Sequence, residues 1–125
     1  MVTGVGIDLV EVTRIEEKIN RAQGFRELVF SGNEIKYCEA ATHKFEHYAA
    51  RFAAKEAFFK ALGTGWANGT AFNEIEVVNQ SNGKPHLLLS GTTAQTLHHL
   101  HNARIDVSLS HTSSMATAIV VIQQG

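Results

Sequence analysis

Cysteine and proline are almost absent from this chain of 125 residues, which has one cysteine, Cys38, and one proline, Pro85. A single cysteine excludes a disulfide within the chain and fits a reducing compartment, so we expect a cytoplasmic protein. Cys38 lies in a segment expected to be helical, and we interpret it as an inert helix residue rather than a nucleophile. The first residues carry no charged leader before an apolar core, so we expect no signal peptide.

Long apolar runs and an excess of one charge are also missing. No apolar stretch approaches the roughly 18 residues of a membrane-spanning helix, so no membrane insertion is expected. The 11 Lys and Arg residues nearly balance the 12 Asp and Glu residues, and the formal net charge is −1. Without a basic footprint, nucleic-acid binding is not expected. The length predicts one globular domain, residues 1–125, that buries a core of its own.

The periodic segments that the chain does contain are typical of an α+β fold. In chain order we predict a strand at 2–9, helices at 12–22, 25–30, 31–41 and 44–62, strands at 74–79 and 86–89, a helix at 91–101, and strands at 104–110 and 116–122. The last two strands pair around a short turn. Ser31 and Glu34 have capping-box spacing at the start of the third helix.

The first strand has an unusual composition. Val5, Ile7 and Leu9 alternate with Gly4, Gly6 and Asp8, which predicts a short buried strand. Glycine weakens a strand, so two glycines on one face indicate that another backbone or a ligand comes close there.

The helix at 44–62 is the most informative segment. Phe45, Tyr48, Phe52 and Phe59 recur at helical spacing, and Glu56 falls on the same apolar stripe. A carboxylate in apolar surroundings is costly unless a cation or hydrogen bonds satisfy it. Three cations, Arg51, Lys55 and Lys60, lie close by in sequence, and Gly63 supplies a helix stop before a Gly-Thr-Gly turn. This combination indicates a metal and phosphate site.

Asp8 is the second informative carboxylate. It is either the N-cap of the following helix or a partner of Glu56, and spacing alone leaves both readings open. If the two carboxylates meet, they suit Mg²⁺, which takes one or two carboxylates and leaves positions for water and substrate phosphates. Lys60, one turn after Glu56, either reaches a phosphate or forms a surface ion pair with Glu56.

Histidines occur in two further places. In Ser108-Leu109-Ser110-His111, neighbouring residues of a strand point to opposite faces, so direct activation of a serine by His111 is geometrically poor. These residues either tie off a turn or bind a ligand, with His111 as a proton acceptor. His98, His99 and His101 are interpreted as part of a solvated helix face, since only His98 and His101 would share a side.

Taken together, several segments resemble the holo-acyl-carrier-protein synthases, the short bacterial class of 4′-phosphopantetheinyl transferases. The resemblance covers essentially the whole chain. It rests on Gly4-Val5-Gly6-Ile7-Asp8, on the run from Arg51 to Ala61, on Gly63-Thr64-Gly65, on Asn82-Gly83-Lys84-Pro85 and on Ser108-Leu109-Ser110-His111.

The resemblance implies a fold, a reaction and a set of site residues. The fold would be a mostly antiparallel sheet packed on a long helix. The enzyme would transfer the 4′-phosphopantetheine arm of coenzyme A (CoA) to a serine of apo-acyl carrier protein and release adenosine 3′,5′-bisphosphate, a step of fatty acid biosynthesis. Asp8 and Glu56 would hold Mg²⁺, Lys60 would neutralise the leaving group, and Glu56 or His111 would accept the serine proton. The residues implied to hold CoA are Arg51, Lys60, Gly63, Gly65, Asn82, Gly83, Lys84, Pro85 and His111.

The resemblance also implies partners. Acyl carrier protein is acidic, and Arg14 matches the family residue that docks it. Arg21 and Arg26 would extend this patch. Members of this length form homotrimers with active sites at subunit junctions, which the apolar final strands of this chain permit.

Two rival functions use the same residues. The first is a Mg²⁺-dependent pyrophosphatase of CoA or another nucleotide, with water as the nucleophile. The second is a non-catalytic module that binds carrier protein or nucleotide. Asp8, Glu56 and Lys60 together favour an enzyme.

Overall fold

The long helix α4 lies under a three-stranded sheet and forms the centre of the molecule. The computed structural model describes residues 1–21, 23–63 and 70–125. The elements are β1 (Val2–Glu11), α1 (Val12–Arg21), α2 (Phe25–Val29), α3 (Gly32–Ala40), α4 (Lys44–Leu62), the 3₁₀ turn η1 (Phe72–Glu74), β2 (Ile75–Asn79), β3 (Pro85–Leu89), α5 (Gly91–Gln95), β4 (Arg104–His111) and β5 (Met115–Gln123). None of the described helices is long and apolar enough to span a bilayer.

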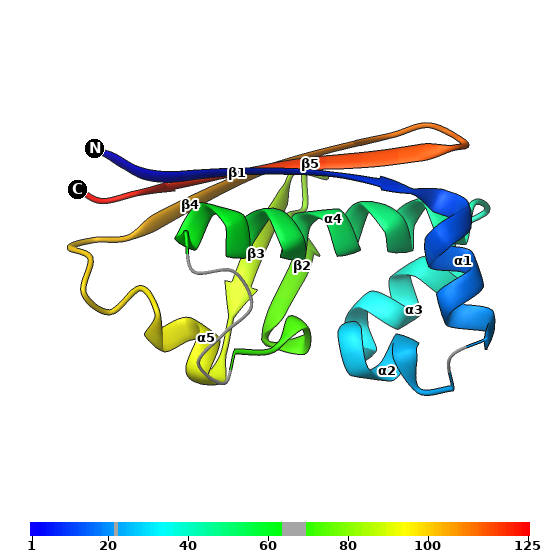
Figure 1. Cartoon of the computed structure of the whole chain (residues 1–125). Helices are drawn as coiled ribbons and strands as arrows, with labels where there is room; N and C mark the ends of the chain where they lie inside the picture. Colours follow the sequence, from blue (N-terminus) through cyan, green and yellow to red (C-terminus); the bar gives the residue numbers. More distant parts are fainter. Residues whose placement is uncertain (22, 64–69) are drawn as a thin grey trace.

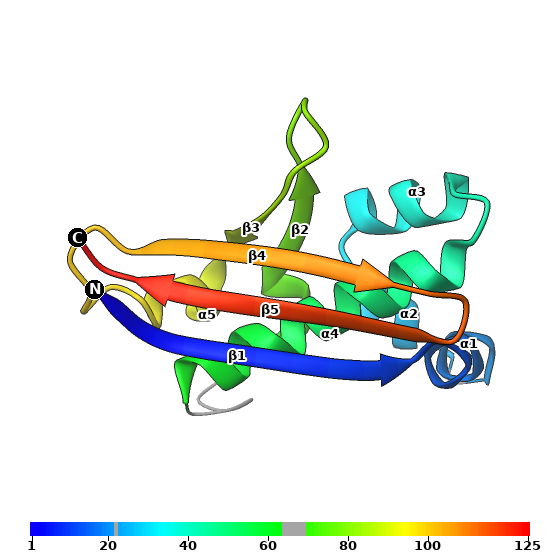
Figure 2. The ribbon, with the colours of Figure 1, turned by 90° about the horizontal axis from the view of Figure 1, so that it is seen from above.

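Two antiparallel sheets are present among the described residues. In the larger sheet, β5 lies between β1 and β4, and α4 runs along one face (Figures 1 and 2). In the smaller sheet, β2 pairs with β3, and this hairpin projects past β4 (Figure 2). Helices α1, α2 and α3 gather at one end of α4 (Figure 1). The predicted α+β fold, an antiparallel sheet on a long helix, is therefore confirmed.

The glycines of β1 let this strand lie against α4. A Cβ built on Gly4 would collide with the carbonyl oxygen of Ala61, and one on Gly6 would collide with that of Ala57. The predicted close approach of another backbone is thus confirmed, and that backbone belongs to α4. Because the glycine face looks inward, the alternate face of β1 looks outward.

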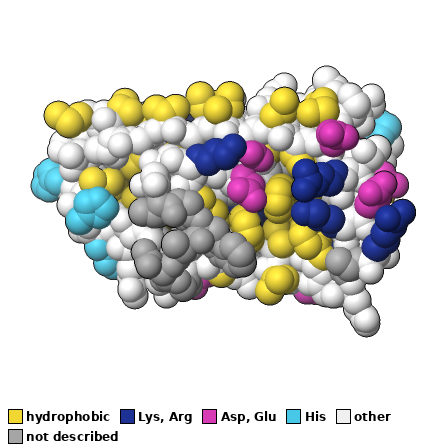
Figure 3. Space-filling model, in the orientation of Figure 1, with side chains coloured by type: hydrophobic (Ala, Val, Ile, Leu, Met, Phe, Trp, Pro, Cys, Tyr) yellow, Lys and Arg dark blue, Asp and Glu magenta, His cyan; other side chains and the backbone are white. Residues whose placement is uncertain are grey.

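The predicted burial of the apolar residues of β1 is wrong. Val5, Ile7 and Leu9 are 57%, 62% and 64% exposed. Side chains alternate across a strand, so once the helix occupies the glycine side, these three side chains can only point to the opposite side. A row of hydrophobic side chains appears along this edge of the molecule in Figure 3.

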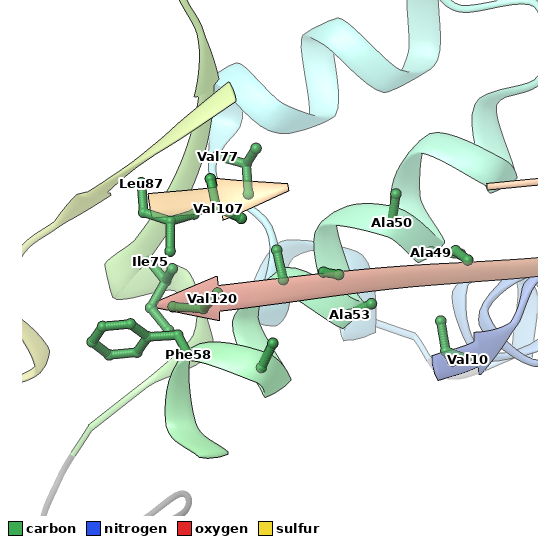
Figure 4. Packing of buried hydrophobic residues seen from close by; sticks show 14 of the residues in the cluster. Val10, Ala49, Ala50, Ala53, Phe58, Ile75, Val77, Leu87, Val107 and Val120 are labelled. Atoms are coloured by element: carbon green, nitrogen blue, oxygen red, sulfur yellow. The ribbon is translucent and has the colours of Figure 1, made fainter. Parts of the chain in front are cut away.

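The core is built from small residues of α4 and branched residues of the strands. Ala49, Ala50 and Ala53 of α4 are buried, and their small size lets the sheet approach closely. Figure 4 shows Val107 and Val120 of the large sheet in the same cluster as residues of the small sheet: Ile75, Val77 and Leu87. Both sheets therefore share one core.

A buried ion pair crosses this core and was not predicted. The ammonium of Lys55 donates to Glu34 Oε1 at 2.6 Å, and both side chains are fully buried. The same ammonium donates to the carbonyl oxygens of Val29 and Phe72, at 2.8 and 3.1 Å. The predicted capping box is confirmed, because Ser31 and Glu34 exchange both hydrogen bonds. Glu34 therefore caps α3 and neutralises a lysine of α4 at once.

The predicted helix at 91–101 is much shorter than expected. Helix α5 covers only Gly91–Gln95, and turns follow to residue 102. The amide nitrogens of Thr96, His98 and Leu100 donate to the carbonyl three residues earlier, as in 3₁₀ turns, rather than four. Glycine and threonine are poor helix formers, which fits this outcome. His98, His99 and His101 therefore lie on turns. They are exposed to solvent as predicted, but the prediction that they lie on a helix is wrong.

Candidate active site

Asp8 and Glu56 line one hollow at the junction of β1, α1 and α4. The hollow has a volume of about 320 Å³, and its lining residues are Asp8, Leu9, Val10, Arg14, Ile15, Lys18, Phe52, Glu56 and Lys60. Asp8 shares the inward face of β1 with Gly4 and Gly6, so the packing of those glycines on α4 carries its carboxylate to the helix. The alternative role of Asp8 as a helix N-cap is wrong, because α1 begins only at Val12.

Lys60 pairs with Asp8 rather than with Glu56. Its ammonium lies 2.9 Å from Asp8 Oδ1 and 3.1 Å from the carbonyl oxygen of Ile7. The alternative of a surface pair between Lys60 and Glu56 is therefore not what the structure shows. Lys60 stays 54% exposed while Asp8 is 16% exposed, so the lysine reaches from solvent over the carboxylate.

Glu56 carries a charge that the nearby lysines compensate only in part. Within the described part of the chain no group donates a hydrogen bond to it, and burial raises its pKa, with the nearby charge of Asp8 adding to the effect. Lys60 and Lys18 oppose this rise without cancelling it. A carboxylate that is half-buried, close to another carboxylate and without a donor would be stabilised by a bound cation.

The donor set fits Mg²⁺ better than a metal held by protein alone. Among residues 1–21, 23–63 and 70–125 there is no group of three or more His, Cys, Asp or Glu side chains that could hold a metal. Two carboxylates beside open space are what a Mg²⁺ site shared with substrate phosphates requires.

Basic side chains flank this hollow on α1. Arg14 is exposed and lines the hollow. Lys18, one helical turn further on, also lines it and lies over the rings of Phe25 and Phe52, at 5.7 and 5.8 Å from their centroids. Figure 3 shows acidic and basic side chains gathered around hydrophobic ones in the middle of this face. Lys18 was missed, although its spacing of four residues from Arg14 would have placed it on the same side.

A second hollow of about 200 Å³ lies where β4, the β2–β3 hairpin, α3 and α4 meet. Its lining residues are Tyr37, His47, Ala50, Arg51, Asn79, Gly83, Pro85, Leu109 and His111. Arg51, Gly83, Pro85 and His111 were all predicted to hold CoA, and the fold brings these four together. Tyr37 and His47 were not predicted.

Within residues 1–21, 23–63 and 70–125, Arg51 is a buried cation without an acidic partner. It is 3% exposed, and its guanidinium lies 4.2 Å from the ring centroid of Tyr37. Its Nε atom has no hydrogen-bond partner, and none of the ion pairs among the described residues involves it. Burying an unpaired charge is costly, so an anion bound beside the guanidinium of Arg51 would be stabilising.

His111 ends β4 and turns its ring toward α4. Its Nδ1 atom lies 2.8 Å from Glu46 Oε1, and its ring centroid is 5.1 Å from that of His47. Burial lowers the pKa of His47, and the neighbouring His111 adds to this. Ser108 and Ser110 are exposed on β4, and the described hydrogen bonds include none between them and His111.

The remaining predicted residues lie outside both hollows. Asn82 and Lys84 are exposed at the tip of the hairpin, where Lys84 N donates to Asn82 Oδ1 at 3.0 Å. Gly63 ends α4 with a φ of 82°, which confirms its role as a helix stop. Gly65 lies outside the described residues.

Arg21 and Arg26 line a different hollow, which they share with Glu27 and Glu39. Arg26 is paired with both of these acids, at 2.7 and 3.2 Å. Its charge is thus already compensated, whereas none of the ion pairs in the described part of the chain includes Arg14.

The two hollows lie on different sides of α4. His47 and Arg51 face the second hollow, whereas Phe52, Glu56 and Lys60 face the first. At about 100° per residue, Arg51 and Glu56 point roughly 140° apart around the helix axis. A ligand would have to wrap around α4 to fill both hollows of one chain.

Comparisons with known proteins agree on one family. The model of the 4′-phosphopantetheinyl transferase superfamily matches residues 4–120. The holo-[acyl-carrier-protein] synthase of Ruminiclostridium cellulolyticum is 48% identical over 123 residues, which cover 97% of this chain and 92% of that protein. The corresponding protein of Cytophaga hutchinsonii is 44% identical over 126 residues, with 99% of each chain covered. A holo-(acyl-carrier-protein) synthase from Bacillus anthracis, solved in complex with CoA (3′,5′-ADP), has a TM-score of 0.82 and 35% identity, and the match covers 100% of this chain and 99% of that one.

Proposed function

Because the chain belongs to the 4′-phosphopantetheinyl transferase superfamily, we propose that its two hollows bind CoA and catalyse transfer of the phosphopantetheine arm. The arm moves from CoA to a serine of apo-acyl carrier protein, and adenosine 3′,5′-bisphosphate is released. The observation that carries this proposal is the meeting of Asp8, Glu56 and Lys60 in one hollow. The single cysteine fits the reducing cytoplasm, where we expect the protein to act.

In the first hollow, Asp8 and Glu56 would hold Mg²⁺. When bound, the ion would supply charge neutralisation for the pyrophosphate of CoA. Lys60 adds positive charge beside the carboxylates for the leaving bisphosphate. Glu56 is the better candidate for accepting the serine proton, because it lies in the same hollow as Asp8 and Lys60. His111, the alternative base, lies in the other hollow.

In the second hollow, Arg51 and His111 would bind phosphate groups of CoA. The buried and unpaired guanidinium supports this assignment, since an arriving phosphate would supply its missing partner. Gly83 adopts a φ of 87°, and with Pro85 it forms the wall contributed by the hairpin.

We propose that the protein works as a homotrimer whose active sites combine the first hollow of one subunit with the second hollow of the next. Two observations support this. The hollows lie on different sides of α4 and so cannot easily serve one ligand within one chain. The outward face of β1 also exposes Val5, Ile7 and Leu9 in a row, as an interface strand would.

The acidic carrier protein would dock on α1. Arg14 and Lys18 border the hollow that holds Asp8 and Glu56, so a bound acidic helix would bring its serine to the carboxylates. Arg21 is exposed further along the same helix and could extend the contact. Arg26 is a weaker candidate because Glu27 and Glu39 already pair with it.

Intact-mass spectrometry of an apo-acyl carrier protein incubated with this protein, CoA and Mg²⁺ tests the function. We expect a mass gain of one phosphopantetheine arm that disappears in chelator and in Asp8→Ala. Asp106→Ala is the matched control, because Asp106 also pairs with a cation, Arg104, but lies outside the hollow. Breakdown of CoA without a mass gain would indicate the pyrophosphatase instead. If neither a mass gain nor breakdown of CoA occurs with any carrier protein tested, the protein is the non-catalytic binding module.

Mixing two inactive variants tests the shared site. Asp8→Ala and Arg51→Ala should each be inactive, and subunit exchange between them should restore activity. If a junction takes Asp8 from one chain and Arg51 from the next, random mixing leaves about a quarter of the junctions intact. No recovery in a mixture shown by light scattering to be trimeric would mean that each chain builds its own site.

A further inference from the structure

Glu46 holds the ring of His111 from the first turn of α4. Its Oε1 atom lies 2.8 Å from His111 Nδ1, and its side chain is 16% exposed, against 31% for the histidine. The residues are 65 positions apart in sequence, so this contact exists only in the folded chain. Glu46 does not line the second hollow, whereas His111 does.

This contact decides which nitrogen of His111 can meet a ligand. An imidazole has two ring nitrogens, and the hydrogen bond made by one fixes the role of the other. A carboxylate can only accept, so Nδ1 must carry a proton. Nε2 is then the nitrogen left for the hollow that Arg51 also lines.

We propose that Glu46 is a positioning residue, which holds His111 by Nδ1 so that Nε2 is presented, beside Arg51, to a phosphate group of CoA. A phosphate oxygen only accepts hydrogen bonds, so the ring binds it as the imidazolium, with Nδ1–H donated to Glu46 and Nε2–H donated to the phosphate. The inference rests on the proposed function, because it needs CoA in the second hollow. It assigns His111 to binding of the donor substrate rather than to removal of the serine proton. The arrangement is that of a histidine held by a carboxylate, which fixes ring orientation and tautomer.

A purely structural role is the alternative for Glu46. An acidic residue in the first helical turn interacts favourably with the helix dipole. Its second oxygen also lies 4.0 Å from Nδ1 of His43, the residue that precedes α4. A test must therefore use readouts that helix stability does not change.

Kinetics with CoA as the varied substrate give the first readout, for Glu46→Gln and Glu46→Ala. In Glu46→Ala we expect the KM for CoA to rise about tenfold, which corresponds to ~1.4 kcal/mol, with little change in kcat. Glu46→Gln keeps a side-chain oxygen that can accept from Nδ1, so its KM should rise less. A fall in kcat with unchanged KM would overturn the binding role.

Nitrogen-15 NMR of the imidazole groups gives the second readout. Without CoA, the neutral ring of His111 should carry its proton on Nδ1 in the native protein and in Glu46→Gln. In Glu46→Ala it should shift toward the Nε2–H tautomer. An unchanged tautomer in the alanine variant, with a native-like spectrum elsewhere, would refute the positioning role.

A double-variant cycle asks whether Glu46 acts through His111. In a His111→Ala background, removing Glu46 should raise the KM for CoA no further. His43→Ala is the control for the other contact of Glu46 and should leave the KM unchanged. Additive effects of Glu46→Ala and His111→Ala would contradict the inference. Failure of the native protein to transfer the arm at all would instead contradict the proposed function, so the two failures are distinguishable.

Discussion

Lys55→Met should strongly destabilise the protein, because it leaves a buried carboxylate without its cation. The ammonium of Lys55 has three acceptors, Glu34 Oε1 and two backbone carbonyls, and no part of either charged side chain reaches solvent. Burial lowers the pKa of Lys55, and the charge of Glu34 opposes this shift, so the lysine depends on that carboxylate for its charge. Methionine matches the length of lysine but supplies neither charge nor donors.

The magnitude follows from the burial of the pair. Removing one partner of a fully buried ion pair typically costs 3–5 kcal/mol, because the remaining charge is uncompensated. The two carbonyls, from Val29 and Phe72, each lose a hydrogen bond as well. Since the stability of a domain is about 5–15 kcal/mol, we expect Lys55→Met to lose about a fifth of it or more.

Urea unfolding followed by circular dichroism measures this loss. Lys36→Met is the matched control, because Lys36 is exposed on α3, and it should stay within about 0.5 kcal/mol of the native protein. Glu34→Gln combined with Lys55→Met should recover part of the stability, since the stranded charge is removed. A loss below about 1 kcal/mol for Lys55→Met alone would show that the pair is not the stabilising contact inferred from its burial.

Three further predictions concern the site and the packing. Burial, and to a lesser extent the charge of Asp8, raise the pKa of Glu56. At pH values between the ordinary carboxyl pKa and this raised pKa, the folded state binds more protons than the unfolded state. The free energy of unfolding therefore falls as the pH rises through this window. Thermal melts in chelator should therefore show Glu56→Gln gaining stability over the native protein at about pH 7 but not at about pH 3, and equal gains at both would contradict this. Gly6→Ala should cost about 1–3 kcal/mol in urea, because its Cβ would strike a carbonyl of α4; Gly32→Ala, with open space around its Cβ, is the control and should cost nothing. Burial raises the pKa of the Cys38 thiol to about 12, so iodoacetamide should label it at neutral pH only after unfolding, and rapid labelling of the folded protein would refute the assignment.

Local features were predictable from the sequence because neighbouring residues determine them. Helix α4 has the predicted bounds, since apolar spacing marks its body and Gly63 ends it with a positive φ. The capping box of Ser31 and Glu34 depends on a spacing of three residues. By contrast, the helix predicted at 91–101 ends after Gln95, so periodicity alone overestimated its length.

The sequence indicated several residues of the candidate site but not their contacts, and it did not indicate Lys18, Tyr37 or His47. The resemblance indicated Asp8, Glu56, Arg51 and His111, and spacing alone left open whether any two of them meet. Only the packing of β1 on α4 brings Asp8 into the same hollow as Glu56. The same packing lets Lys60 form its ion pair with Asp8 rather than with Glu56. Residues that act through others, such as Glu46, carried no signal in the sequence because their partners lie far away along the chain.

The sequence by itself thus determined the element types, most of the helix ends and the set of chemical groups. The tertiary structure decided which face of β1 is buried, which acid neutralises Lys55 and that α4 separates Arg51 from Glu56. The physical reason is the distance along the chain over which each interaction acts. Backbone propensity, capping and helical periodicity act over a few residues, whereas burial and ion pairing depend on which surfaces the whole chain brings together.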